Sequence, residues 1–373
     1  MPRRTSLTAA AVLVTLSGAA AAQSNVTVFG LLDITAGRFT GAPTGVNAQD
    51  EATFRVSSGG MSTSHFGLRG SEDLGGGLLA SFELATFIRN DTGAAGRSDS
   101  IPAPVNVAAD PFWSRAAWVG VGSSTLGRVR VGNATTLMFL NSILSNAFGD
   151  STVFSPINLV TFIGAPLSGG TGWTNSIVYD SPNLSGLSLH AQHALGERPG
   201  GHNTGLRAAY ARGPWAASLA WQNVEKDPQT FADGTSPNDT RSWQLAASFD
   251  FQVVKLFAHL GRIRNEGTEA APLDVGYRIW ELSASVPVGT GRVLAGYANR
   301  KTDDAVGPVP ATVAGGNVER AVLTVGYDHP LSRRTDLYAM ATNDKTKTNT
   351  LPGPPTVVSA SATNVGVGIR HRF

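Results

Sequence analysis

The chain has 373 residues, of which 29 are basic, 27 are acidic and none is cysteine. The lack of cysteine excludes disulfides, thiolate metal sites and a cysteine nucleophile. The near balance of charge, without any basic block, argues against a nucleic-acid-binding protein. Hydrophobic residues make up 42% of the chain, yet no segment after residue 22 is a long uninterrupted apolar run of the kind that a spanning helix needs.

The N-terminal residues have the composition of a secretory signal peptide. Arg3 and Arg4 supply positive charge, an apolar stretch covers 7–16, and the alanines at 20–22 form a small-residue cleavage site before Gln23. The apolar stretch is short for a spanning helix, so a membrane anchor is the less favoured alternative. We expect residues 1–22 to be removed on export, which leaves 27 basic (29 − 2) and 27 acidic residues.

Apolar and polar residues alternate with a period of two along most of the remaining chain. This period is typical of β-strands with one apolar face, and each segment is near the ~9–11 residues that a tilted strand needs to cross a bilayer. The sixteen segments are 26–39, 63–70, 77–89, 112–122, 127–134, 174–181, 186–196, 203–212, 215–226, 240–250, 252–265, 275–287, 291–302, 318–329, 335–344 and 362–373.

The connections between these segments alternate between short and long. Short turns on one rim and long loops on the other are typical of an outer-membrane barrel. We therefore predict an all-β fold, a transmembrane antiparallel β-barrel of about sixteen strands. A secreted β-domain for adhesion or carbohydrate binding is the soluble alternative. The short connections include 71–77, 123–126, 182–185, 213–214 and 288–290, and the long ones include 90–111, 227–239, 303–316 and 345–361.

The segment from about 135 to 173 is long for a surface loop and rich in large apolar residues. Apolar residues at helical spacing predict a short helix packed on the inner wall of the barrel. A disordered extracellular loop is the less favoured alternative, because such loops seldom contain so many large apolar residues. The helical stripe is Leu137, Leu140, Ile143 or Leu144, and Phe148, and the later apolar residues are Phe154, Ile157, Leu159, Phe162 and Ile163.

Strand parity assigns one set of charged residues to the barrel interior. If Phe66 and Leu68 face lipid, their neighbours face the lumen, and the same parity directs Arg115, Ala117 and Val119 inward. An arginine buried in lipid costs about 2–4 kcal/mol at the midplane, a penalty that a water-filled lumen removes. The predicted basic wall is His65, Arg69, Arg115, Arg128 and Arg130; Asp33 and Glu83 are further lumen candidates.

The last strand ends on an aromatic residue, Phe373, beside the terminal carboxylate. An aromatic residue there suits the boundary between lipid and water, whereas a buried terminus costs desolvation energy. The outward positions are Val365, Val367, Ile369 and His371, and the residues between them are Gly366, Gly368, Arg370 and Arg372.

Five stretches of the sequence, in this order, resemble the strands of Gram-negative general porins. The resemblance implies a sixteen-stranded barrel, usually trimeric, through which small hydrophilic solutes diffuse across the outer membrane and whose third loop narrows the pore. It also implies that Phe373 is the signal read by the barrel-assembly machinery, with outer-membrane lipid and lipopolysaccharide as surroundings. The stretches are SNVTVFGLLD, SHFGLRGSEDLGGGLLASFEL, SRAAWVGVGSSTLGRVRVGN, TNSIVYDSPNLSGLSL and VGVGIRHRF.

The chain departs from that family at the constriction. The inward loop has a single acid, Asp150; His65 stands where an arginine is common, and residues 133–134 are Asn-Ala where Arg-Gln is frequent. We expect a net positive potential with a weakened transverse field, and hence a preference for anions. A nearly unselective pore is the alternative, because Glu83 and the acids at 303–304 could rebalance the charge.

Other chemistries find little support in the sequence. An enzyme is the main rival, but the chain has no G-x-S-x-G elbow and no H-E-x-x-H motif. His65 is read as a polar wall residue, with a titrating switch as its alternative, and the acids at 303–304 are read as a solvated loop rather than a divalent-cation site. We expect no catalytic residue, metal or cofactor, and a substrate-preferring porin stays open.

Overall fold

The computed structural model describes residues 25–40, 52–96, 111–162, 168–196, 201–225, 239–266, 275–305, 317–350 and 356–373. The predicted signal peptide, 1–22, lies outside these residues, as do the side chains of Asp303 and Asp304. Within the described ranges, no helix is both long enough and apolar enough to cross a membrane.

The described residues form strands almost throughout, with two short helices between the seventh and eighth strands. The strands are β1 (Asn25–Phe39), β2 (Thr53–Ser58), β3 (His65–Gly75), β4 (Leu78–Arg89), β5 (Ala94–Ala95), β6 (Ala116–Ser123), β7 (Gly127–Thr135), β8 (Gly172–Asp180), β9 (Leu187–Ala194), β10 (Asn203–Arg212), β11 (Trp215–Val224), β12 (Asp239–Asp250), β13 (Lys255–Glu266), β14 (Val275–Val288), β15 (Gly291–Ala305), β16 (Asn317–Pro330), β17 (Thr335–Thr350) and β18 (Thr356–Arg372). The helices are α1 (Leu137–Leu144) and α2 (Pro156–Phe162).

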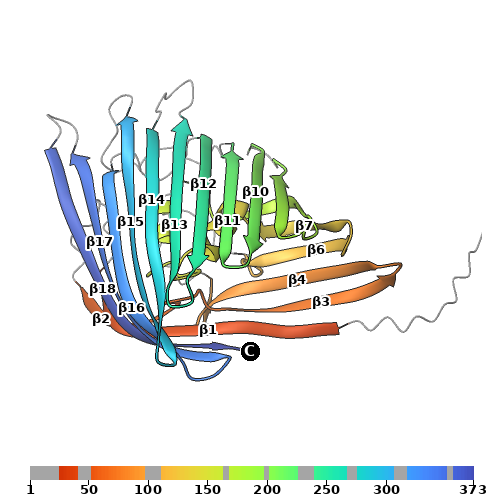
Figure 1. Ribbon diagram of the computed structural model, residues 1–373, viewed down its shortest axis with the longest axis horizontal. Coiled ribbons are helices and arrows are strands. Elements are labelled where there is room, and N and C mark those ends of the chain that lie inside the picture. Colours follow the sequence, from red (N-terminus) through yellow and green to blue (C-terminus); the bar gives the residue numbers. More distant parts are fainter. Residues whose placement is uncertain are drawn as a thin grey trace, which may run out of the picture.

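The sheet closes on itself because β18 pairs with β1, from Leu31 opposite Arg372 to Arg38 opposite Val365. Figure 1 shows β10 to β17 standing side by side and β1, β3, β4 and β6 crossing another part of the wall. On its other edge, β1 pairs with β3 over its first half and with β2 over its second half, so β2 and β3 act as one interrupted barrel strand. With β5 only a two-residue extension beside β4, the result is a closed antiparallel barrel of sixteen strands, which confirms the predicted fold class.

The strand β2 was not predicted. Residues 59–64, which separate it from β3, turn into the barrel, and Met61 among them is fully buried. A strand divided by an inward turn has too few alternating residues on each side to be recognised from periodicity alone.

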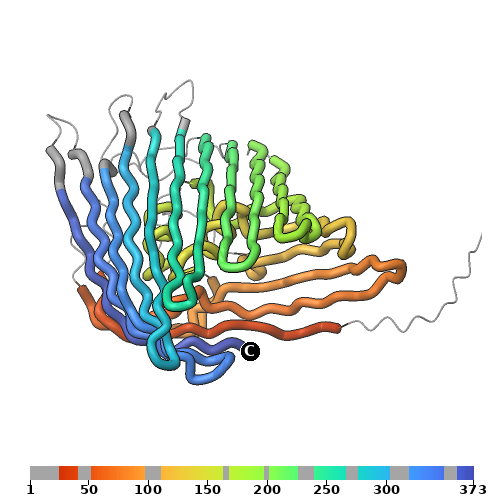
Figure 2. The backbone as a smooth tube through the Cα atoms, in the orientation of Figure 1, coloured from red at the N-terminus to blue at the C-terminus, as the bar shows by residue number. Residues whose placement is uncertain are grey.

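The connections on one rim are tight turns, as the alternation of connection lengths predicts. Figure 2 shows such turns at the lower ends of the neighbouring strands, with the C-terminus beside β1. Between β3 and β4, Gly75, Gly76 and Gly77 all have φ between +60° and +81°, a region that favours glycine. The turns are 76–77, 124–126, 181–186, 213–214, 251–254, 289–290 and 331–334.

The outer surface of the barrel is apolar. Leu245 lies opposite Leu260, and Leu260 lies opposite Trp280, so exposed apolar side chains of successive strands share one face. Their chain neighbours Gln244 and Glu281 are buried on the inner face. An apolar outer band with a polar interior matches a strand that separates lipid from a polar lumen.

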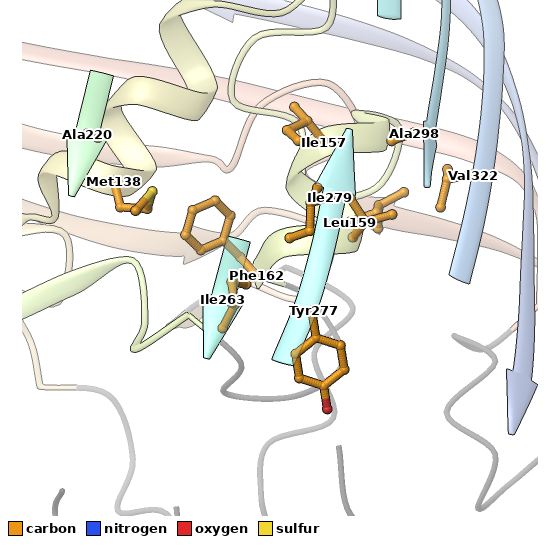
Figure 3. Packing of buried hydrophobic residues seen from close by; sticks show 11 residues of the cluster. Met138, Ile157, Leu159, Phe162, Ala220, Ile263, Tyr277, Ile279, Ala298 and Val322 are labelled. Atoms are coloured by element: carbon orange, nitrogen blue, oxygen red, sulfur yellow. The ribbon is translucent and has the colours of Figure 1, made fainter. Parts of the chain in front are cut away.

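The segment between β7 and β8 folds into the barrel and packs on the inner wall. One apolar cluster joins α1 and α2 to β11 and β13 to β16, and Figure 3 shows Met138 and Phe162 facing Ala220 and Ile263 of the wall. A second cluster joins Phe148 and Phe154 of this segment to β1, β13, β15 and β17 and to the 59–64 turn. The inward loop therefore packs mainly on the wall formed by β10 to β17.

Candidate functional site

Four arginines from three parts of the chain line one cavity between the barrel wall and the inward loop. Its volume is about 470 Å³, and its lining includes Arg69, Arg115, Arg128 and Arg130. Glu83 also lines it, opposite Arg69 in the strand register. Leu137 and Leu140 of α1 lie on its other side.

The cross-strand register explains why these arginines share a face. Arg128 lies opposite Gly122 and Arg130 opposite Gly120, while Val129 and Val131 face the other way. Residues that lie directly opposite each other project from the same face of a sheet. Two glycines beside the guanidinium groups leave space on the inner face for long side chains.

The predicted orientation of the fourth segment is wrong for Ala117 and Val119. Val119 lies opposite the outward Val131 and is 61% exposed, whereas Trp118 lines the cavity. Arg115 nevertheless faces the cavity, because it precedes β6 and the regular alternation begins only after it: Arg115 and Ala116 both line the cavity. A break in the alternation of inward and outward residues at a strand end cannot be recognised from the sequence pattern.

Asp180 is an acid of the basic wall that the sequence analysis missed. Its carboxylate accepts hydrogen bonds from Arg128 Nη2 at 3.1 Å, and from Arg130 Nε at 2.9 Å and Nη2 at 3.3 Å. His190 Nδ1 lies 2.9 Å from the same carboxylate. The parity of 174–181 against Arg128 could have found it, because Asp180 lies opposite Arg128 in the register.

Glu83 and aromatic rings hold the remaining guanidinium groups. Arg115 Nη1 lies 3.6 Å from Glu83 Oε1, and both side chains keep partial exposure to the lumen. Arg128 and Arg130 lie 5.3 and 5.2 Å from the ring centre of Trp118, and Arg69 lies 4.9 Å from that of Phe29. Such cation–π contacts contribute roughly 0.5–1 kcal/mol each at exposed sites and fix the arginines along the wall.

Asp33 is on the inner side of the wall but is not a lumen group. It is fully buried and accepts backbone N–H bonds from Gly60, Met61 and Ser62 at 3.1, 2.8 and 2.7 Å, as well as the Tyr338 hydroxyl. The carboxylate therefore fixes the inward turn at 59–64, and the structure does not place it in the cavity.

His65 and Asp150 also lie outside the cavity lining. His65 is 8% exposed, and its Nδ1 lies 2.9 Å from the carbonyl oxygen of Thr63. Asp150, on the loop, accepts a hydrogen bond of 2.7 Å from Ser62 Oγ. Of the predicted residues, the four arginines and Glu83 line one cavity, whereas His65, Asp33 and Asp150 are not among its lining residues.

Buried arginines of the far wall anchor α2. Arg300 Nη1 donates to the carbonyl oxygen of Val160 at 3.0 Å, and Arg320 Nη1 donates to that of Leu159 at 2.7 Å. These carbonyls belong to the C-terminal turn of α2, where cations are favourable. Arg320 also pairs with Asp344 at 2.6 Å.

Helix α1 is anchored through polar residues on its wall side. Asn141 donates to Gln244 Oε1 at 2.9 Å and accepts from Arg207 Nε at 3.2 Å. Leu140, which the helical stripe predicts to pack on the wall, turns the other way and is partly exposed in the cavity, and Leu144, the alternative to Ile143 in that stripe, is 62% exposed. The constriction therefore has a basic side from the barrel and an apolar side from α1.

The chain terminus completes the wall. Phe373 N donates to Gly30 O and Gly30 N donates to Phe373 O, both at 3.1 Å. Its ring lies so close to Gly30 that a Cβ atom there would be 2.4 Å from Cζ.

In the described part of the chain, no group of three or more His, Asp or Glu side chains could hold a metal ion.

The comparisons with known proteins agree with this architecture. A family model described as Gram-negative porin matches residues 9–349. Outer membrane porin protein 32 of Delftia acidovorans is 31% identical over 99% of each chain, and an outer membrane porin protein of Bordetella pertussis is 27% identical over 98% of this chain and 99% of its own.

Two solved structures extend the comparison. An anion-selective porin from Comamonas acidovorans is 27% identical, with a TM-score of 0.74 over 94% of this chain and 100% of its own. The trimer form of OmpT from Vibrio cholerae has a TM-score of 0.66 over 94% of this chain and 99% of its own, at 14% identity, and therefore shares the fold alone.

Proposed function

The chain belongs to the Gram-negative porin family and forms a channel for small hydrophilic solutes in the outer membrane, and we propose that this channel prefers anions. The observation that carries the proposal is the charge of the cavity, where four arginines face the carboxylates of Glu83 and Asp180. The anion selectivity stated for the Comamonas acidovorans porin supports the same direction.

The opposite side of the cavity strengthens this preference. The inward loop has one acid, Asp150, and it hydrogen-bonds Ser62 away from the cavity lining. Without an acidic partner across the passage, the arginines impose a net positive potential on it. Such a potential raises the local concentration of anions and repels cations.

Reversal potentials of the purified protein in planar bilayers, across a potassium chloride gradient, test the proposal. We expect chloride to be more permeant than potassium, and Arg130→Gln to lower the chloride preference. Arg334→Gln is the matched control, because it removes the same charge from the exposed 331–334 turn. A wild-type channel that prefers potassium would refute the proposal.

We propose a homotrimer as the assembled state. The outward face of β1 supports it, because Val26 and Val28 are about 60% exposed in the single chain and could pack against a second copy. The trimer form recorded for OmpT of Vibrio cholerae shows that this fold can assemble so. Native mass spectrometry of the detergent-extracted protein should give a mass three times that of the mature chain; a monomer mass alone would contradict it.

Anionic outer-leaflet lipid, including lipopolysaccharide, is a proposed partner of an outward basic belt. Arg262 lies opposite the outward Trp243 on one side and Arg278 on the other, and Arg278 lies opposite Lys301. These charges face outward near the rim of long connections, which is the extracellular side of such barrels. Arg262→Gln with Arg278→Gln should reduce the lipopolysaccharide that co-purifies in mild detergent; unchanged amounts would exclude the belt.

Export and insertion complete the proposal. We propose cleavage before Gln23 and recognition of the strand that ends at Phe373 by the barrel-assembly machinery. Sequencing the N-terminus of the outer-membrane protein tests the cleavage, and a start at Met1 would exclude it. We assign no catalytic role to the chain, because it belongs to a family of channels.

A further inference from the structure

Helix α1 departs from the usual amphipathic arrangement, because its buried side contains polar side chains as well as Leu137 and Met138. Two of its polar side chains, Asn141 and Ser142, are fully buried: Asn141 bonds Gln244 and Ser142 donates to Asn158 Oδ1 at 2.7 Å. The exposed and partly exposed side chains of the helix are all apolar, and they are Phe139, Leu140, Ile143 and Leu144.

Exposing this face to water is unfavourable unless something apolar passes it. The side of α1 that carries Met138 packs on Ala220 and Ile263 of the barrel wall, as Figure 3 shows. The face that carries Leu140 and Leu144 points away from that wall, and Leu140 lines the same cavity as Arg115 and Arg130. A helix enclosed by a barrel leaves no room for a second protein, so the occupant of this face is a solute in the passage.

The cavity has arginine side chains on one side and leucine side chains on the other. A guanidinium group matches a carboxylate with two parallel hydrogen bonds, which Arg130 already makes with Asp180. The side formed by Leu137 and Leu140 has no side-chain donor or acceptor for a hydroxyl group. The cavity of about 470 Å³ lies within the ~300–1,000 Å³ typical of small-molecule sites.

We propose that the constriction favours amphiphilic monocarboxylates, in which one carboxylate is joined to an aromatic or branched aliphatic body. The carboxylate binds Arg115 or Arg130 in the cavity, and the apolar body contacts Leu140 there and Leu144 one helical turn further along α1. This preference rests on the proposed anion selectivity and adds the class of anion. Compact hydrophilic anions gain the charge contact alone and pass with less discrimination.

Bi-ionic reversal potentials test the proposal in planar bilayers, with potassium benzoate on one side and potassium acetate on the other at pH 8. Both acids are ionised there, and benzoate is the larger ion, so simple sieving favours acetate. We expect benzoate to be the more permeant ion. Leu144→Gln should reduce the benzoate-to-acetate ratio about fourfold, the factor for returning roughly one methylene group to water.

Leu331→Gln is the matched control, because Leu331 is 56% exposed, close to the 62% of Leu144, but lies in the 331–334 turn instead of on α1. It should leave the ratio unchanged. If Leu144→Gln does not insert, Leu144→Ala keeps the apolar character, removes contact area and should lower the ratio in the same direction.

The possible outcomes distinguish a failure of this inference from a failure of the proposed anion selectivity. A wild-type channel that prefers chloride to potassium but acetate to benzoate overturns the inference and leaves the anion channel intact. A benzoate preference that persists in both Leu144 variants also overturns it, because the preference would not arise at α1. A wild-type preference for potassium over chloride removes the proposed function and the inference together.

Discussion

Replacing Asp180 with asparagine should make the channel more anion-selective. Asp180 is the acid within the basic wall, and its side chain is only 15% exposed between Arg128, Arg130 and His190. Asparagine keeps one oxygen that can accept from Arg130, so the wall geometry survives while one negative charge is lost. The same four arginines then face Glu83 alone.

The size of the effect follows from Coulomb's law. A unit charge roughly 8 Å from a passing ion contributes about 0.5 kcal/mol in water. A Debye length of about 10 Å at 0.1 M salt reduces this to about 0.2 kcal/mol. Because the chloride and potassium energies shift in opposite directions, their ratio changes by about 0.4 kcal/mol, or about twofold. An effective dielectric constant half that of water would make the change about fourfold.

The assay is the zero-current potential across a tenfold potassium chloride gradient, repeated at higher salt. Glu83→Gln, which removes the other acid of the cavity, should move the potential in the same direction. The effect of Asp180→Asn should shrink as salt rises, because screening shortens the reach of the charge. An unchanged or lower chloride preference at low salt would refute the electrostatic account of the constriction.

Two substitutions and one deletion test how the wall, the loop and the C-terminus are held. Arg320→Leu leaves Asp344 as an unpaired buried charge and should lower the free energy of unfolding by about 3–5 kcal/mol, measured by urea titration; a stable variant would show that the pair is dispensable. Deleting Phe373 removes both backbone bonds to Gly30 and should reduce folded, heat-modifiable protein in the outer membrane severalfold, and normal levels would argue against the assembly signal. Asp33→Ala leaves three buried N–H donors of the 59–64 turn without their acceptor, at a cost of roughly 1–3 kcal/mol each. It should increase open-channel noise in single-channel recordings, and quiet channels would mean that the turn is fixed by other contacts.

The barrel could be predicted from the sequence because its two environments impose a simple period. Lipid outside and a polar interior require alternation along every strand, and some turns are marked by glycines such as Gly75, Gly76 and Gly77. The pattern failed at Thr53–Ser58, where a strand is interrupted by a turn that packs inward. That interruption depends on the contact between Asp33 and the turn, which no local pattern encodes.

The site was only partly predictable for the same reason. Arg69 follows from unbroken alternation, whereas Arg115 reaches the cavity at a break in parity. Asp180 lies among the arginines and not on the loop, and the pairing of β7 with β8 brings it opposite Arg128. Strand parity assigns His65 to the inner face, but its side chain is buried there and does not line the cavity. Strand parity predicts a direction, and it does not predict what lies in that direction.

The position of each arginine, rather than the number of arginines, determines what the passage offers to a solute. Arg300 and Arg320 also point inward, but they are buried and bonded to carbonyl oxygens of α2, so their role is to hold the loop against the far wall. The arginines beside Trp118 remain partly exposed, and they supply the potential that a passing ion meets. Because the loop is held by wall arginines and buried amides, its lumen side needs no polar groups of its own, and Leu140 and Leu144 can face the solute. A substitution on that side of α1 can therefore change which anions pass while the charge and the anchoring of the constriction stay the same.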